Sequence, residues 1–276
     1  MSKRARLILL PAIIVAAAWA ACAAPSGSAP AASPSLRTLV AVLAHPDDET
    51  LFSPALAHYA RAGVRVHLVI ATDGSQGVAP HAGIPSGDSL ATIRVEEARC
   101  AARELGLREP IMLGLPDAGL AVLRPWPGEP LDRLATRLED LFRELHPQAV
   151  ITLGPEGGYG HPDHRLVGTV VTQVFQSGAV PRRSRLFFPG FTTERMASGP
   201  RRLGVTVYPT APALLTTRVA FGPSDLAAAR RALACHRSQF TEETMHEISA
   251  VLEHWWQGGV SFQEWRGGGR SEGLFD

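Results

Sequence analysis

The stretch LVAVLAHPDDE occupies residues 39–49 and joins a run of apolar residues to a cluster of acidic ones. The run from Leu36 to Ala44 has the length of a strand, and its apolar residues do not alternate with polar ones. This pattern is typical of a strand that is covered on both faces in a parallel sheet. The acidic cluster leads into a segment from Thr50 to Ala62 that we expect to be a helix, ended by Gly63.

A second stretch, YGHPDH at residues 159–164, repeats the His-Pro-Asp tripeptide of residues 45–47. It follows a predicted strand, Gln148 to Leu153, and precedes a predicted helix, His164 to Phe175. Ligands of open α/β sheets bind at the carboxyl ends of the strands, where such loops gather. We therefore expect the two His-Pro-Asp stretches to face one crevice.

The rest of the chain continues the alternation of strands and helices. Further strands are predicted at 64–71, 110–115, 185–188, 204–208 and 216–221, and helices at 88–105, 131–145 and 223–239. A long loop rich in Gly, Pro and Ser lies between Thr72 and Gly87, and loops of this length inside α/β units are commonly functional. The alternation predicts an α/β fold, a Rossmann-like, mainly parallel sheet flanked by helices, in a single catalytic domain over residues 36–276.

The N-terminus has the pattern of an export signal. Lys3, Arg4 and Arg6 precede an apolar stretch from Leu7 to Trp19 that is too short for a comfortable membrane span. We expect residues 1–21 to be a signal peptide. The end of this segment resembles the lipobox of bacterial lipoproteins, which predicts that Cys22 is lipidated, with simple secretion as the alternative.

Residues 22–35 consist almost entirely of Ala, Pro, Ser and Gly and predict a flexible tether. The protein is thus expected to be exported to the cell envelope and anchored to the outer face of the membrane through lipid. Beyond Cys22 the cysteines are Cys100 and Cys235. An oxidising compartment permits a disulfide between them, but two free buried thiols are the alternative.

Composition narrows the range of partners. The 276 residues carry a formal net charge of +1 and are 45% hydrophobic, as in a globular protein with a substantial core. No basic stripe interleaved with aromatic residues is evident, so we expect no nucleic-acid partner. The expected partner is a small-molecule substrate.

The residue types in the two stretches indicate a metal site. His45 and Asp48 lie on one side of the entering helix, and His164 adds a second imidazole. Two imidazoles and one carboxylate suit Zn²⁺ and leave one coordination position open for water, as catalytic zinc sites require. Asp47, adjacent but not a ligand, is then the candidate general base that takes the proton of that water.

The second stretch supplies the groups expected to act on the substrate. His161 and Tyr159 can donate hydrogen bonds to a developing oxyanion, and Asp163 can orient a neighbouring imidazole. The implied reaction is metal-assisted hydrolysis of an acyl bond, without a Ser or Cys nucleophile.

At these residues the chain resembles the PIG-L/LmbE-like zinc-dependent N-deacetylases, which include deacetylases of N-acetylglucosaminyl-phosphatidylinositol, of the mycothiol precursor and of some glycopeptide antibiotics. The resemblance runs from about Leu39 to Phe240 and includes the segments TDG (72–74), RVEE (94–97), LPD (115–117) and HRSQ (236–239). It implies the same ligands, His45, Asp48 and His164, the same base, Asp47, and an electrostatic or acid role for His161. By the same resemblance Arg94 and Asp117 are expected to bind substrate.

Several of these residues also have a purely structural interpretation. Arg94 can form a surface ion pair with Glu97, Asp117 can be a turn residue beside Gly119, and His236 can be a structural histidine. Glu49 can favour the helix start or support a ligand.

The predicted function is that of an exported zinc-dependent enzyme that removes an N-acetyl or other N-acyl group from an amino sugar or glycoconjugate. Two alternatives stay open: an N-acyl amidase acting on a peptide-like or antibiotic substrate, and a non-catalytic glycan-binding lipoprotein.

Overall fold

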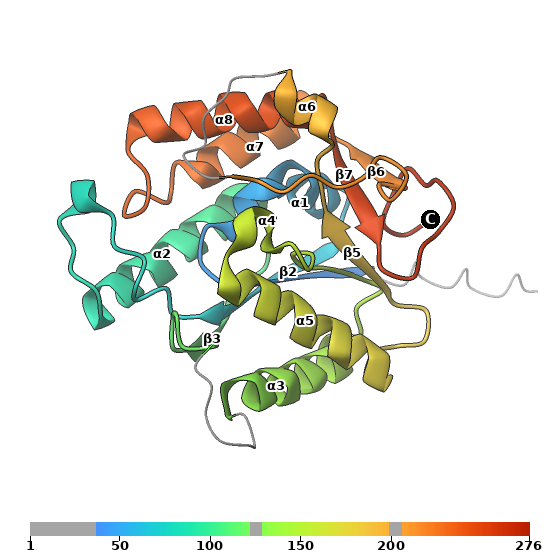
Figure 1. Ribbon diagram of the computed structural model, residues 1–276, viewed down its shortest axis with the longest axis horizontal. Helices are drawn as coiled ribbons and strands as arrows, with labels where there is room; N and C mark the ends of the chain where they lie inside the picture. The colour runs from blue at the N-terminus through green and yellow to red at the C-terminus, as the bar shows by residue number, and fades with distance from the viewer. Residues whose placement is uncertain (1–36, 122–128, 199–205) are drawn as a thin grey trace, which may run out of the picture. The chain divides into compact units, whose positions relative to one another are not determined.

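The computed structural model describes residues 37–121, 129–198 and 206–276 (Figure 1). The predicted signal peptide, the tether and Cys22 lie outside the described residues. So do Gly204 and Val205 of the strand predicted at 204–208.

The strands form one sheet in the order β3-β2-β1-β4-β5-β7-β6. Their bounds are β1 Thr38–Leu43, β2 Arg65–Thr72, β3 Ile111–Leu115, β4 Ala149–Ile151, β5 Arg185–Pro189, β6 Thr217–Ala220 and β7 Gly259–Glu264. The five strands from β3 to β5 in this order pair in parallel, whereas β7 is antiparallel to both β5 and β6. The predicted α/β fold with a mainly parallel sheet is confirmed.

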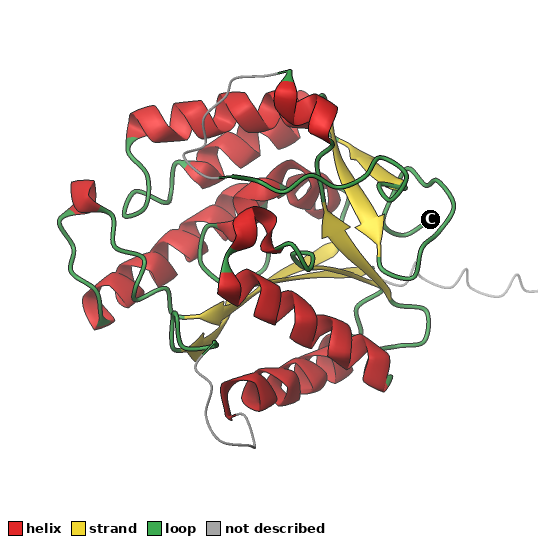
Figure 2. Cartoon of the chain, viewed as in Figure 1, coloured by secondary structure: helices red, strands yellow, loops and turns green. Residues whose placement is uncertain are grey.

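Helices cover both faces of this sheet (Figure 2). The longer ones are α1 Ser53–Arg61, α2 Asp88–Leu105, α3 Glu129–Leu145, α5 Pro162–Ser177, α7 Pro223–Leu233 and α8 Glu242–Trp256. Shorter turns are the 3-10 helices η1 Asp48–Leu51 and η2 Pro80–Ala82, and the helices α4 Gly157–Gly160 and α6 Thr193–Ala197. In Figure 1 α3 and α5 lie on one side of the strands, and α1, α2, α7 and α8 lie on the other.

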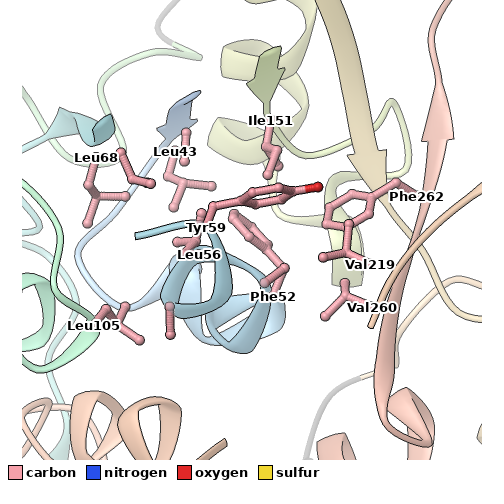
Figure 3. Packing of buried hydrophobic residues seen from close by; sticks show 14 of the residues in the cluster. Leu43, Phe52, Leu56, Tyr59, Leu68, Leu105, Ile151, Val219, Val260 and Phe262 are labelled. Atoms are coloured by element: carbon pink, nitrogen blue, oxygen red, sulfur yellow. The ribbon is translucent and has the colours of Figure 1, made fainter. Parts of the chain in front are cut away.

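The side chains of β1 alternate between two hydrophobic clusters, one on each face of the sheet. Leu39, Ala41 and Leu43 join the cluster under α1, α2 and α7, part of which Figure 3 shows. Val40 and Val42 join the cluster under α3 and α5. All of β1 is buried, which explains why its sequence is an unbroken apolar run rather than an alternating one.

Three predicted elements differ from the observed ones. The acidic stretch enters η1 before α1, because Pro54 stands in the first turn of α1 and limits how early that helix can begin. The helix predicted over 223–239 ends at Leu233, and residues 206–208 of the predicted strand 204–208 have no strand pairing. Two further elements, α8 and β7, are not predicted from the sequence, and Trp255 and Trp256 of α8 are buried in the core.

A disulfide joins Cys100 in α2 to Cys235, two residues after α7. The two cysteines therefore form a disulfide and are not two free buried thiols. Among the described helices, none combines the length and the apolar composition needed to cross a membrane.

Candidate metal centre

The two His-Pro-Asp stretches meet at one edge of the sheet. Strands β1 and β4 are neighbours that pair in parallel, so their carboxyl ends lie side by side. His45 follows β1, and His164 lies in the first turn of α5, after the glycine-rich loop that leaves β4. The centroids of the two imidazole rings are 5.2 Å apart.

Three donor atoms converge at this edge. Nε2 of His164 lies 3.2 Å from Nδ1 of His45 and 3.0 Å from Oδ1 of Asp48. Nδ1 of His45 lies 3.7 Å from Oδ2 of Asp48. Burial alone would raise the pKa of Asp48, but the charge and hydrogen bonds of His164 and His45 hold this pKa well below its ordinary value. Asp48 is therefore an ionised carboxylate facing two imidazoles.

Hydrogen bonds to the backbone orient two of these side chains. Oδ2 of Asp48 accepts the N–H groups of Ala44, at 3.1 Å, and of His45, at 2.9 Å. Nδ1 of His164 lies 3.1 Å from the carbonyl oxygen of Gly157, which can only accept, so Nδ1 carries the proton. The lone pair of His164 Nε2 is thus directed toward the other two donor atoms, as in histidines that bind metals.

The third side chain, His45, is held by two carboxylates on its far nitrogen. Its Nε2 lies 3.2 Å from Oδ1 of Asp117 and 3.4 Å from Oδ2 of Asp163. Burial would lower the pKa of His45, but Asp117, Asp163 and Asp48 raise it to about 12. Surroundings that stabilise a positive charge this strongly also favour a divalent cation.

The spacing of these three side chains is close to that of a tetrahedral zinc site. Zinc bonds of about 2.0–2.2 Å place the ligand atoms of a tetrahedral site roughly 3.3–3.6 Å apart. Here the two imidazole nitrogens are 3.2 Å apart, and those of His164 and His45 lie 3.0 Å from Oδ1 and 3.7 Å from Oδ2 of Asp48 respectively. Two other groups of donor atoms, His45 with His161 and His164, and His45 with Asp117 and Asp163, each lie within 4.8 Å. We favour the first set because it combines two imidazoles with one carboxylate, and because Asp48 and His164 are already oriented by hydrogen bonds to the backbone.

Asp47 lies beside this trio in an unusual backbone conformation. Its φ is 104° and its ψ is −17°, a region that residues other than glycine seldom adopt. Burial raises the pKa of Asp47 to about 6, although the neighbouring Arg94 guanidinium lowers it. A carboxyl group with a pKa near 6 suits a general base that works close to neutral pH.

Arg94 is buried, with 3% of its surface exposed, and reaches Asp47 from α2. Its Nη2 donates to Oδ2 of Asp47 at 3.1 Å and to the carbonyl oxygen of Pro46 at 2.6 Å, and its Nη1 donates to the carbonyl oxygen of Gly74 at 3.0 Å. The alternative of a surface ion pair with Glu97 is wrong, because Glu97 instead accepts hydrogen bonds from Ser238. Substrate binding by Arg94 stays a prediction.

The two candidate oxyanion donors lie next to the histidines of the trio. Tyr159 is 37% exposed, and its ring lies 5.0 Å from the ring of His164. The ring of His161 lies 4.7 Å from that of His45, and its Nδ1 accepts the N–H of Asp163. Burial lowers the pKa of His161, and the nearby His45 and His164 lower it further, so the ring is neutral and its Nε2 carries the exchangeable proton.

Asp117 and Asp163 share one role in this structure. Both contact Nε2 of His45, and Oδ2 of Asp163 also accepts the N–H of Ala118. The expected orientation of an imidazole by Asp163 matches this contact. Asp117 further accepts the N–H of Gln76, from the loop that follows β2. Its predicted contact with substrate stays a prediction.

A buried pair of side chains, His236 and Glu49, supports the site and is not predicted from the sequence. Nε2 of His236 lies 2.7 Å from Oε1 of Glu49, and both side chains are buried. No local pattern in the sequence connects positions 187 residues apart, so the sequence does not predict this pair.

Residues 40–175 match the family PIG-L, described as GlcNAc-PI de-N-acetylase. The chain carries a PIG-L family domain. That domain contains every candidate metal-site residue described above, from His45 to His164.

Curated relatives of this PIG-L domain include two described as 1D-myo-inositol 2-acetamido-2-deoxy-alpha-D-glucopyranoside deacetylases. The one from Catenulispora acidiphila is 38% identical over 177 residues, 58% of this chain and 54% of the relative. The one from Mycobacteroides abscessus is 33% identical over 178 residues, 59% and 63% of the two chains. The match thus spans only about half to three fifths of the length of these relatives.

Solved structures with the same fold include N,N'-diacetylchitobiose deacetylase from Pyrococcus horikoshii, with a TM-score of 0.59, 21% identity and 83% of each chain covered. A zinc inhibited form of the teicoplanin deacetylase Orf2 gives a TM-score of 0.60 at 17% identity, over 82% of this chain and 97% of that one. The 4-carboxy-2-hydroxymuconate hydratase GalB from Pseudomonas putida also has this fold, with a TM-score of 0.56, 15% identity and coverage of 83% and 96%. Since the fold includes a hydratase as well as deacetylases, the activity has to be argued from the site.

Proposed function

We propose that this chain is a zinc-dependent N-deacetylase that removes an acetyl group from the nitrogen of an amino sugar or glycoconjugate. The observation that carries the proposal is the convergence of His45, Asp48 and His164 with Asp47 beside them. The curated relatives are described as deacetylases of a 2-acetamido sugar, which supports an amino sugar over a peptide-like substrate.

A zinc ion held by these three residues would lower the pKa of a bound water toward about 7 and polarise the amide carbonyl. Asp47 takes a proton from the attacking water as its oxygen adds to the carbonyl carbon. Tyr159 and His161 donate hydrogen bonds to the carbonyl oxygen as negative charge develops there. The proton held by Asp47 then passes to the leaving nitrogen, the C–N bond breaks, and acetate and a free amine are released.

The test is acetate release from N-acetylglucosamine derivatives by the purified full chain in detergent, after metal removal and after stepwise addition of zinc. We expect activity that rises to one equivalent of zinc, and an Asp47→Asn variant that binds zinc normally but is slower by about 10²- to 10⁴-fold. A chain that binds zinc but hydrolyses no N-acetyl sugar would overturn the proposed substrate class. Turnover of N-acyl peptides or glycopeptides alone would favour the amidase alternative, and glycan binding without turnover would favour the lipoprotein alternative.

We also propose that the protein is exported and anchored to the outer face of the membrane through a lipid on Cys22. The sequence pattern of residues 1–22 and the Cys100–Cys235 disulfide support this location, since disulfides persist mainly in oxidising compartments. Mass spectrometry of the mature N-terminus tests the anchor. An unmodified N-terminus after cleavage would indicate simple secretion instead.

A further inference from the structure

The backbone of Asp47 has a conformation that surrounding contacts must hold. A non-glycine residue at a φ of 104° persists only where surrounding contacts hold it there. Arg94 donates to the Asp47 carboxylate at 3.1 Å and to the carbonyl oxygen of Pro46 at 2.6 Å, and the N–H of Thr50 donates to the carbonyl oxygen of Asp47 at 3.1 Å. A second contact is needed at the N–H of Asp47, which none of these hydrogen bonds engages.

Glu49 makes that second contact. Its Oε2 accepts the N–H of Asp47 at 3.2 Å, across the intervening ligand Asp48. The Glu49 side chain is fully buried, and a buried carboxylate is stable only with partners that compensate its charge. Its other oxygen, Oε1, lies 2.7 Å from Nε2 of His236.

His236 lies between two residues that are tied to α2, one by a disulfide and the other by hydrogen bonds. The preceding residue, Cys235, is bonded to Cys100 in α2, the helix that also carries Arg94. Two residues after His236, the N–H and hydroxyl groups of Ser238 donate to Glu97 of the same helix at 2.6 and 2.7 Å. Helix α2 and the segment after α7 thus form one unit, with Arg94 reaching the carboxylate of Asp47 and His236 reaching Glu49.

We propose that His236 and Glu49 are positioning residues for Asp47: their contact fixes the Glu49 carboxylate, which holds the Asp47 N–H and so the turn that directs the Asp47 carboxylate to the reaction site. The role rests on the proposed function, because it presumes that Asp47 is the base. The competing interpretation is a buried ion pair that only stabilises the fold.

The first experiment measures kcat, KM, zinc stoichiometry and thermal stability for His236→Ala and His236→Gln. We expect His236→Ala to lower kcat by about 10- to 100-fold, since small displacements of a reacting group cost rates of that order, with KM and zinc content unchanged. Glutamine can place its amide nitrogen where Nε2 lies and should restore most of kcat. A kcat within twofold of the wild-type value for His236→Ala, or a loss of zinc in step with kcat, would overturn the proposal.

A double-mutant cycle separates positioning from stability. If His236 acts through Asp47, His236→Ala should lower kcat by no more than about threefold in an Asp47→Asn background. If the full loss is repeated in that background, the role is only structural. The control is Asp225→Asn, which changes a buried carboxylate that pairs with Arg61 and accepts the N–H of Gly222, and it should lower stability without lowering kcat.

Hydrogen exchange of the Asp47 amide, followed by NMR of the ¹⁵N-labelled full chain, reads the contact directly and needs no turnover. We expect exchange to be about tenfold faster or more in His236→Ala and close to wild type in His236→Gln. Unchanged exchange in His236→Ala would overturn the proposal. If the wild type shows no deacetylase activity, the proposed function fails, while this measurement still decides whether His236 holds the Asp47 backbone.

Discussion

Asp48 Oδ1 lies 3.0 Å from Nε2 of His164, although the two residues are more than a hundred positions apart in the chain. Both side chains are buried, and each is held from behind by backbone hydrogen bonds. A preformed pair of this kind needs little rearrangement to bind an ion.

Removing Asp48 should therefore remove the metal site. We expect Asp48→Ala to weaken zinc binding by more than Asp163→Asn, for which a loss of about 10- to 100-fold is expected because Asp163 contacts His45 from behind. Calorimetric titration of the metal-free chains measures both. Wild-type zinc affinity in Asp48→Ala would remove Asp48 from the ligand set.

The close approach of Arg94 to Gly77 predicts a loss of activity in Gly77→Ala. A Cβ at Gly77 would collide with Nη1 of Arg94. The Arg94 guanidinium is buried, and its two terminal nitrogens donate to three acceptors, so it cannot move aside at low cost. We expect kcat to fall roughly tenfold as Arg94 and Asp47 shift. Gly269→Ala is the matched control, since no atom lies within 4 Å of its added Cβ. Equal activity of the two variants would contradict the placement of Arg94.

Asp225 should contribute a pH-dependent part of the stability. Burial would raise its pKa, but hydrogen bonds from Arg61 and from the Gly222 N–H, with the charge of Arg61, hold the pKa below its ordinary value. A group with a lowered folded-state pKa stabilises the fold above its unfolded-state pKa, about 3.9, and loses that contribution as the pH falls through the folded-state value.

We therefore expect Asp225→Asn to lower the free energy of unfolding by about 1–2 kcal/mol at pH 7, a figure reduced for the solvent exposure of Arg61. The difference from wild type should stay constant down to about pH 4 and shrink below it. Urea unfolding between pH 7 and pH 3 gives these values. If the difference in the free energy of unfolding grew as the pH fell, the lowered pKa of Asp225 would be contradicted.

The disulfide closes a long loop and should stabilise the fold substantially. Cys100 and Cys235 are 135 residues apart, and loops of this length correspond to a loss of about 2–5 kcal/mol when the bond is removed. Urea unfolding of the Cys100→Ser/Cys235→Ser variant measures the loss. Peptide mapping without reduction is the companion experiment, and free thiols at both positions in the purified wild type would contradict the bond.

The sequence by itself determined the parallel core of the fold and predicted which residues meet in the candidate metal site. The unbroken apolar run before His45 predicted a strand buried on both faces, because burial on two faces leaves no position for polar residues. The rule that ligands gather at the carboxyl ends of parallel strands then brought His45, Asp48 and His164 together. These inferences depend on local patterns and on sheet geometry, which neighbouring residues encode.

Only the tertiary structure decided which distant side chains support these residues. Arg94 had a plausible local partner in Glu97, but packing of α2 against the site turns it toward Asp47. Likewise, the Glu49–His236 pair exists because the disulfide-linked segment after α7 packs behind the acidic stretch. Such pairings depend on which surfaces become neighbours when the chain packs, and no periodicity in the sequence records that.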